Sequence, residues 1–84
     1  MDRESVEPIV IGVIEDRACV KVTPDMYDTD LTVLGVDSLT AIDIAHELES
    51  ALDAVIDDRE MLRLRNVNDI LDYVARTPAT TVTG

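Results

Sequence analysis

Apolar residues between positions 5 and 18 recur at intervals of three and four, the spacing of one helix face. Ser5 is placed to be the N-cap of this helix, with Glu7 and Pro8 in its first turn. The β-branched residues and Gly12 would also suit a strand, but the 3.6-residue period favours a helix. The predicted buried face consists of Val6, Ile9, Val10, Val13 and Ile14.

Residues 38–53 carry the clearest helical pattern of the chain. Asp37 directly precedes this pattern, where its carboxylate is placed to cap the free N–H groups of the first turn. The acidic residues of the segment fall largely on the faces that carry few apolar residues. The predicted buried face consists of Leu39, Ile42, Ala45, Leu48 and Leu52.

Two shorter helices are predicted near the end of the chain. Asp57 and Glu60 stand at capping-box spacing and open a short helical turn. Asn66 opens the last helix, and Thr77 with Pro78 ends it. The buried face of this last helix is predicted to be Val67, Ile70, Leu71 and Val74. A further set is predicted to be core or pocket lining, namely Leu48, Leu52, Val55, Met61, Leu62 and Leu64.

Residues 19–37 hold proline, glycine and several aspartates and are predicted to form one long loop. A loop of this length is uncommon in a compact domain and is usually functional, and its scattered apolar residues indicate that it is pinned across the helices. The fold is therefore predicted to be all-α: a small four-helix bundle of three main helices plus one short helix, with a long first loop. We expect the domain to span residues 1–78 and to be followed by a mobile tail at 79–84.

The 84 residues include 18 acidic and seven basic side chains, which gives a net charge of −11. This charge repels nucleic-acid phosphates and anionic membranes, so neither is expected as a partner. It suits a protein partner with a basic patch, although it would also serve solubility alone. No apolar run is long enough to span a bilayer, and no segment has the pattern of a signal peptide. We therefore expect a cytoplasmic monomer.

Few residues suit catalysis or metal binding. Cys19 is the only cysteine and His46 the only histidine. Cys19 lies near the end of the first predicted helix and His46 in another helix, so a thiol nucleophile with a neighbouring base is not indicated. Cys19 is expected to be a semi-buried structural residue. The aspartates of residues 25–30 do not form an EF-hand, because Val33 and Leu39 occupy the positions that need Gly and Glu. Neither a metal site nor an enzymatic activity is predicted.

The segment 34–39 joins the long loop to the strongest helix. Gly35 allows the chain to turn sharply there. Ser38 stands at the N-terminus of the helix, where unpaired N–H groups and the positive end of the helix dipole favour a phosphate. Its hydroxyl is expected to be exposed, because the apolar face begins only at Leu39.

In these residues the chain resembles the acyl carrier proteins, which belong to the phosphopantetheine-binding carrier family. The signature of that family is Asp-Ser-Leu at the start of the second helix, preceded by Leu-Gly and one variable residue, and residues 34–39 match it in full. The resemblance continues through 40–44, reappears at 56–58 and in the last helix, and covers roughly residues 5–76. It is closest to carriers of the polyketide-synthase type.

The resemblance implies that Ser38 is modified after translation. In the family, a phosphopantetheinyl transferase uses Mg²⁺ and moves 4′-phosphopantetheine from coenzyme A onto this serine hydroxyl. The terminal thiol of the arm then holds an acyl group as a thioester, and the carrier itself catalyses nothing. Asp37 and Leu39 flank the serine in the motif and are expected to take part in this cofactor site.

In the family, acidic side chains of the second helix meet basic patches on partner enzymes. The candidates here are Asp37, Asp43, Glu47 and Glu49, with His46 on the same recognition face. Exposed charges of this kind steer encounter more than they add affinity, and a solvated face is the plain alternative. The resemblance implies a phosphopantetheinyl transferase, a ketosynthase, an acyltransferase or acyl ligase, and a thioesterase or other acyl-processing enzyme as partners.

Departures from the family pattern bear on the pathway. Thr40 stands where fatty-acid carriers usually have Asp, and Thr40 with Ala41 is closer to polyketide-synthase carriers. His46 replaces a residue that is commonly apolar, and Asp57 replaces the usual Pro. We therefore expect a role in polyketide-type secondary metabolism. Fatty-acid synthesis and an aminoacyl or peptidyl carrier are the alternatives, and a helical interaction module without the arm is a rival of another class.

Overall fold

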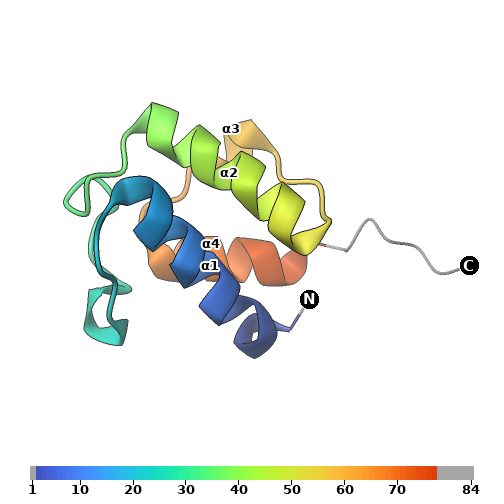
Figure 1. The fold of residues 1–84 in the computed structure, drawn as a ribbon, viewed down its shortest axis with the longest axis horizontal. Coiled ribbons are helices and arrows are strands. Elements are labelled where there is room, and N and C mark those ends of the chain that lie inside the picture. The colour runs from blue at the N-terminus through green and yellow to red at the C-terminus, as the bar shows by residue number, and fades with distance from the viewer. Residues whose placement is uncertain (1, 78–84) are drawn as a thin grey trace, which may run out of the picture.

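The computed structural model describes residues 2–77, and this part of the chain forms four α-helices and one 3₁₀ helix (Figure 1). Their bounds are α1 Arg3–Ala18, η1 Pro24–Met26, α2 Ser38–Leu52, α3 Asp58–Met61 and α4 Val67–Arg76. The all-α fold, with three main helices and one short one, is as predicted. The predicted tail at 79–84 lies outside the described residues.

The core lies where α1 packs against both α2 and α4, while α3 packs against α2 (Figure 1). Within residues 2–77 no charged or polar side chain is buried, so the core is wholly aliphatic. Its largest fully buried side chains are Val10, Ile14, Ile44, Leu48, Met61, Val67, Ile70, Leu71 and Val74. No helix in the described range is both long and apolar enough to cross a bilayer.

Helix α1 begins three residues earlier than the sequence pattern predicts. Asp2, not Ser5, is its N-cap, and the hydroxyl of Ser5 donates to the Asp2 carboxylate at 3.3 Å. Arg3 is ordered in the first turn because its guanidinium pairs with Asp72 and bonds Asn68, both in α4. This long-range contact extends the helix and leaves no local signal. Ile9 was also placed wrongly: it is exposed, whereas the rest of the predicted face is buried.

Helix α2 is rotated relative to the prediction. Its buried residues are Ala41, Ile44, Ala45 and Leu48, whereas Leu39 is 77% exposed. The segment has two overlapping apolar stripes that share positions 45 and 48, and the prediction chose the stripe with the larger side chains. The small Ala41 is buried instead, so the start of α2 packs closely against the rest of the core.

The loop from 19 to 37 is tethered along its whole length. The hydroxyl of Tyr27 donates to Glu7 of α1 at 2.8 Å, and the amide of Leu31 donates to the carbonyl of Arg65 at 2.8 Å. The Tyr27 carbonyl accepts from the amide of Asn68 at 3.1 Å. The expected pinning across the helices is confirmed, and η1 adds a helical turn that was not predicted.

Side chains cap the last two helices largely as predicted. Asp57 accepts from the amide of Arg59 at 2.8 Å, and Asn66 accepts from the amide of Asp69 at 2.8 Å. The predicted capping box of α3 does not form, because Asp57 accepts from Arg59 rather than from Glu60, and the amide of Asp57 donates to the Tyr73 hydroxyl at 3.0 Å. The predicted face of α4 is buried in full. Two residues predicted to be core or pocket lining are largely exposed, Val55 and Leu62, although Leu62 borders a surface groove.

The corrected rotation of α2 makes a direct prediction about its leucines. Leu48 is fully buried and Leu39 is not, so Leu48→Ala should lower the free energy of unfolding by about 2–5 kcal/mol. Leu39→Ala should lower it by less than about 0.5 kcal/mol. Urea unfolding followed by circular dichroism measures both. Equal losses in the two variants would contradict the rotation described here.

Candidate functional site

Ser38 is the first residue of α2 and is exposed. Its hydroxyl makes no side-chain hydrogen bond within the described part of the chain. The exposure is as predicted, but the reason differs, because Leu39 beside it is exposed as well. The result is an accessible, unpartnered hydroxyl at the positive end of a 15-residue helix.

Asp37 caps this helix. Its backbone is extended, and its carboxylate accepts from the amide of Thr40 at 2.8 Å. The amide and then the hydroxyl of Thr40 hold the pKa of Asp37 below its ordinary value of 3.8. The carboxylate therefore stays ionised beside Ser38 at neutral pH and fixes the direction in which the helix begins. The predicted capping role of Asp37 is confirmed.

The approach to Ser38 is a tight turn over residues 31–36. Gly35 has φ of +90°, a left-handed conformation that L side chains rarely adopt, while open space surrounds the position of a Cβ atom. Backbone conformation, not crowding, therefore requires glycine there. Asp30 accepts from the amide of Thr32 at 2.9 Å and from its hydroxyl at 2.7 Å, and these two bonds lower the pKa of Asp30.

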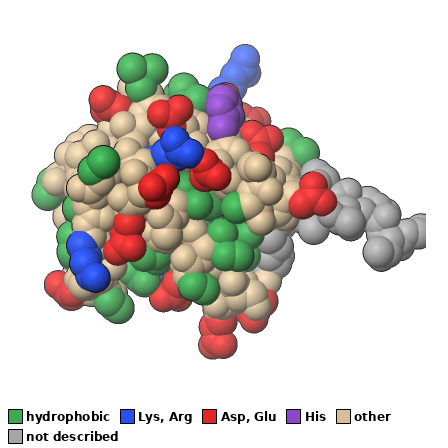
Figure 2. All heavy atoms as spheres, viewed as in Figure 1, with side chains coloured by type: hydrophobic (Ala, Val, Ile, Leu, Met, Phe, Trp, Pro, Cys, Tyr) green, Lys and Arg blue, Asp and Glu red, His purple; other side chains and the backbone are tan. Residues whose placement is uncertain are grey.

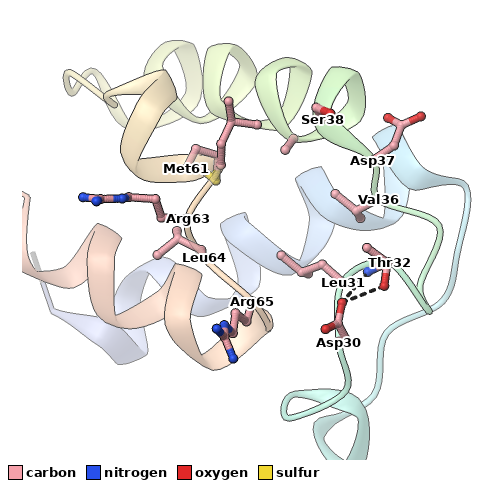
Figure 3. Close-up of a pocket in the computed structure, with 12 residues that line it drawn as sticks. Asp30, Leu31, Thr32, Val36, Asp37, Ser38, Met61, Arg63, Leu64 and Arg65 are labelled. Atoms are coloured by element: carbon pink, nitrogen blue, oxygen red, sulfur yellow. Dashed lines mark hydrogen bonds between the residues drawn. The ribbon is translucent and has the colours of Figure 1, made fainter.

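A groove of about 500 Å³ adjoins Ser38 (Figure 3). It lies between the start of α2, the turn before it and the segment that joins α3 to α4. Half of the lining residues are apolar: Leu31, Val36, Ala41, Met61, Leu62 and Leu64. The other half are polar or charged: Asp30, Thr32, Asp37, Ser38, Arg63 and Arg65. Sequence reasoning missed both arginines, because only the fold brings residues 63–65 beside residue 38.

The predicted docking residues share the surface of α2 but have different environments. Asp43 and His46 are exposed, and Glu47 and Glu49 are half-buried. The guanidinium of Arg17, in the last turn of α1, forms an ion pair with Glu47. That bond and the attraction of the Glu47 charge raise the pKa of Arg17. Arg17 was not among the predicted site residues, since helical spacing along one segment cannot show a contact between two helices.

The histidine and the cysteine have separate partners. The imidazole Nε2 of His46 lies 3.4 Å from a carboxylate oxygen of Asp58 in α3, and with Glu49 these groups approach within 4.8 Å of one another. This is the one trio within residues 2–77 with spacing suited to a metal ion, and it was not predicted from sequence. Cys19 is exposed at the left-handed C-cap of α1, so the expectation of a semi-buried cysteine was wrong.

With the geometry established, comparison with known proteins decides the family. Residues 9–74 match the family described as the phosphopantetheine attachment site. This chain belongs to the phosphopantetheine-binding carrier family. Its cofactor is therefore 4′-phosphopantetheine, and the resemblance to acyl carrier proteins stated above is confirmed.

The relatives include separate carriers and carrier segments of much larger enzymes. The acyl carrier protein of Syntrophobacter fumaroxidans is 32% identical over 82 residues, which cover 94% of this chain and 99% of that protein. The 3-methylorcinaldehyde synthase of a Phoma species is 32% identical over 71 residues, 84% of this chain. A non-reducing polyketide synthase of Aspergillus terreus is 32% identical over 69 residues, 82% of this chain. The chain spans only 3% of the length of each synthase.

The residues around Ser38 fit the cofactor of this carrier family. A phosphodiester needs a free hydroxyl with room for a transferase to approach, and Ser38 offers one at a helix end with no competing hydrogen bond. The adjoining groove offers both apolar and polar contacts to a long, flexible arm. The carboxylate of Asp37 is engaged in capping α2. Leu39 is exposed, so its apolar side chain is available to a partner.

The cap predicts a pH-dependent contribution to stability. Asp37→Ala should lower the thermal midpoint by several degrees, whereas Asp37→Asn should retain most of it, since asparagine caps equally well. The folded-state pKa of Asp37 is depressed, so the contribution of the carboxylate is full above its ordinary pKa and is lost as pH falls through the lowered value. The difference in thermal midpoint between wild type and Asp37→Ala should therefore become smaller at acidic pH.

Thermal unfolding between about pH 2 and pH 7 measures this gap. The difference between Asp37→Asn and Asp37→Ala is the control, because it contains no titrating group at residue 37 and should stay constant. A wild-type gap that does not change with pH would contradict the assigned role of the carboxylate.

Proposed function

We propose that Ser38 carries the 4′-phosphopantetheine arm and that the chain holds acyl intermediates on it as thioesters. The observation that supports this most strongly is the exposed, unpartnered hydroxyl of Ser38 at the start of α2, within the segment that matches the carrier signature. When bound, the arm supplies a terminal thiol whose thioester is activated towards nucleophiles and carbanions. The chain supplies the attachment point and the surface that partner enzymes meet.

We assign a separate task to each residue of the motif. The Ser38 oxygen attacks the phosphorus that bears the pantetheine arm and loses its proton to the transferase or solvent. The phosphodiester bond to Ser38 forms as the phosphoanhydride bond of coenzyme A breaks, and adenosine 3′,5′-bisphosphate leaves. Asp37 holds the first turn of α2 through the amide of Thr40, so that the hydroxyl has a fixed position. Gly35 supplies the left-handed turn that brings the chain to this point. No group of the carrier is required as a catalytic acid or base.

The acyl groups that we propose are polyketide-type intermediates, with fatty-acyl chains as the alternative. Thr40, Ala41 and His46 support this choice, as stated above, and the mixed lining of the groove adds to it. Half of the residues that line the groove are polar or charged, and such a lining suits an oxygen-bearing chain better than a purely aliphatic one. Relatives of both kinds share 32% identity with this chain, so identity alone favours neither pathway.

The proposed partners are enzymes that load, extend and release the acyl group. They comprise a phosphopantetheinyl transferase, a ketosynthase, an acyltransferase or acyl ligase, and a thioesterase. With Asp43, Glu47 and Glu49 on α2, the chain presents an acidic surface that attracts basic patches on such enzymes. Charge-steered contacts form and dissociate quickly, which suits a carrier that visits several active sites.

Modification of Ser38 is tested by intact-protein mass spectrometry. The purified chain is incubated with coenzyme A, Mg²⁺ and a broad-specificity phosphopantetheinyl transferase. Wild type should gain the mass of one phosphopantetheine, and Ser38→Ala should gain none. Ser5→Ala is the matched control, because Ser5 is an exposed serine of α1, and it should be modified like wild type. A folded wild type that stays unmodified with several transferases would refute the proposal and favour an interaction module.

The choice of cargo is tested on the arm-bearing protein by amide NMR. Two samples carry acyl groups of equal length, one saturated and one with a β-keto group. The β-keto chain should move the amides of 30–32 and 63–65 more than the saturated chain does, since these segments supply the polar lining of the groove. Larger shifts from the saturated chain, centred on the core residues Ile44 and Leu48, would favour fatty-acyl cargo instead.

A further inference from the structure

The acidic surface of α2 already holds a cation from the chain itself. The guanidinium of Arg17 bonds the carboxylate of Glu47, and its Nε lies 3.6 Å from a carboxylate oxygen of Asp16. Asp43 attracts the same guanidinium from the preceding turn of α2. Three acidic groups therefore share one arginine at the contact between α1 and α2.

The position of Arg17 overlaps with the surface that a partner is expected to use. A shallow pocket of about 260 Å³ is lined by Arg17, Asp43, His46, Glu47 and Ser50, so the arginine forms one wall of it. Figure 2 shows a basic side chain enclosed by acidic ones on this face of the molecule, close to the histidine. A basic group of a partner that approaches this pocket therefore meets a site in which Arg17 already neutralises the carboxylate of Glu47.

From this arrangement we infer that Arg17 is an internal competitor for partner enzymes: a basic side chain of a partner binds Asp43 and Glu47 only by displacing the guanidinium of Arg17. The inference rests on the proposed function, because it concerns the enzymes that act on Ser38. It assigns Arg17 a role in partner choice that is separate from the modification itself.

The contact is weak enough to be displaced. The side chains of Arg17 and Glu47 are 41% and 37% exposed, and ion pairs with this much solvent contact contribute little to stability. A guanidinium forms two parallel hydrogen bonds with a carboxylate, whereas an ammonium acts as a point charge. Arg17 uses only one terminal nitrogen toward Glu47, so a partner arginine that forms both bonds displaces it more readily than a lysine does. The partner that fits best presents arginine together with at least one further basic group for Asp43 or Glu49.

A double-mutant cycle tests the inference with the transferase as partner. Arg17→Gln should lower the KM for the chain by about two- to fivefold, because Glu47 becomes available and the pair that is removed is a weak one. Glu47→Gln in wild type should change the KM by less than about twofold, since that carboxylate is already paired. In the Arg17→Gln background, Glu47→Gln should raise the KM by about threefold or more. Only competition at Glu47 makes the effect of one substitution depend on the other.

Arg3→Gln is the matched control for charge. It removes the same charge from an arginine that pairs with Asp72, an acidic residue of α4, instead of with an acidic residue of α2. If Arg3→Gln lowers the KM as much as Arg17→Gln does, net charge explains the effect and the inference is overturned. It is also overturned if Glu47→Gln has the same effect in both backgrounds. Thermal unfolding of each variant confirms that all are folded.

A second measurement does not depend on modification of Ser38. Hexa-arginine and hexa-lysine peptides are titrated into the unmodified chain while the amides of Asp43 and Glu47 are followed by NMR. Arg17→Gln should bind both peptides more tightly than wild type, with the larger gain for hexa-lysine, which competes poorly against Arg17. No gain in affinity would overturn the inference. Failure of Ser38 to be modified would refute the proposed function but leave this result standing.

Discussion

Burial of one stripe of α2 controls how every functional side chain of this protein is displayed. Ala41, Ala45 and Leu48 face the core at intervals of four and three, and Ile44 widens the same face. Ser38 continues this stripe by one turn, but it lies beyond the end of the core. Its side chain therefore borders the groove and stays in contact with solvent. The same rotation turns Asp43 away from the core and leaves Leu39 exposed beside the serine.

The loop before α2 and the segment after α3 hold the other side of this arrangement. The amide of Leu31 donates to the carbonyl of Arg65, which joins the two walls of the groove through the backbone. The amide of Arg65 donates in turn to Asp69 of α4 at 3.0 Å. The site is thus built from segments far apart in the sequence, on a scaffold whose core is wholly aliphatic. The polar side chains of residues 2–77 therefore lie at or near the surface of that scaffold.

Charged side chains divide the surface into regions that differ in local charge. The chain is strongly acidic, yet its few arginines lie where they change the local field. Arg17 neutralises part of the α2 surface, and Arg63 and Arg65 line the groove beside Ser38. An enzyme that approaches Ser38 therefore meets acidic groups that differ in availability, with Glu47 paired and Asp43 more open. On the proposal made above, partner choice depends on which carboxylates are free as much as on how many there are.

The sequence predicted what local patterns determine. The caps at Asp37, Asp57 and Asn66, and the whole buried face of α4, follow from short-range chemistry and were found as expected. Predictions failed where distant contacts decide. The contact of Arg3 with α4 extends α1 to a start before Ser5. In α2, Ala41 rather than Leu39 packs against the core.

The groove was likewise not predictable, since residues 30–38 and 61–65 meet only in the folded protein. The proposed attachment residue, Ser38, was in contrast inferred from a short motif in the sequence. Structure adds that this residue is accessible and that its helix is firmly capped.

The central claim is that the arm is attached to Ser38, and tandem mass spectrometry tests it at the level of single residues. The chain is modified by a transferase and cleaved after its basic residues, which gives a peptide from 22 to 59 that holds both Ser38 and Ser50. Fragment ions should place one phosphopantetheine on Ser38 and leave Ser50 and Ser5 unmodified. An arm on any other residue, or none on a folded chain, would contradict this account.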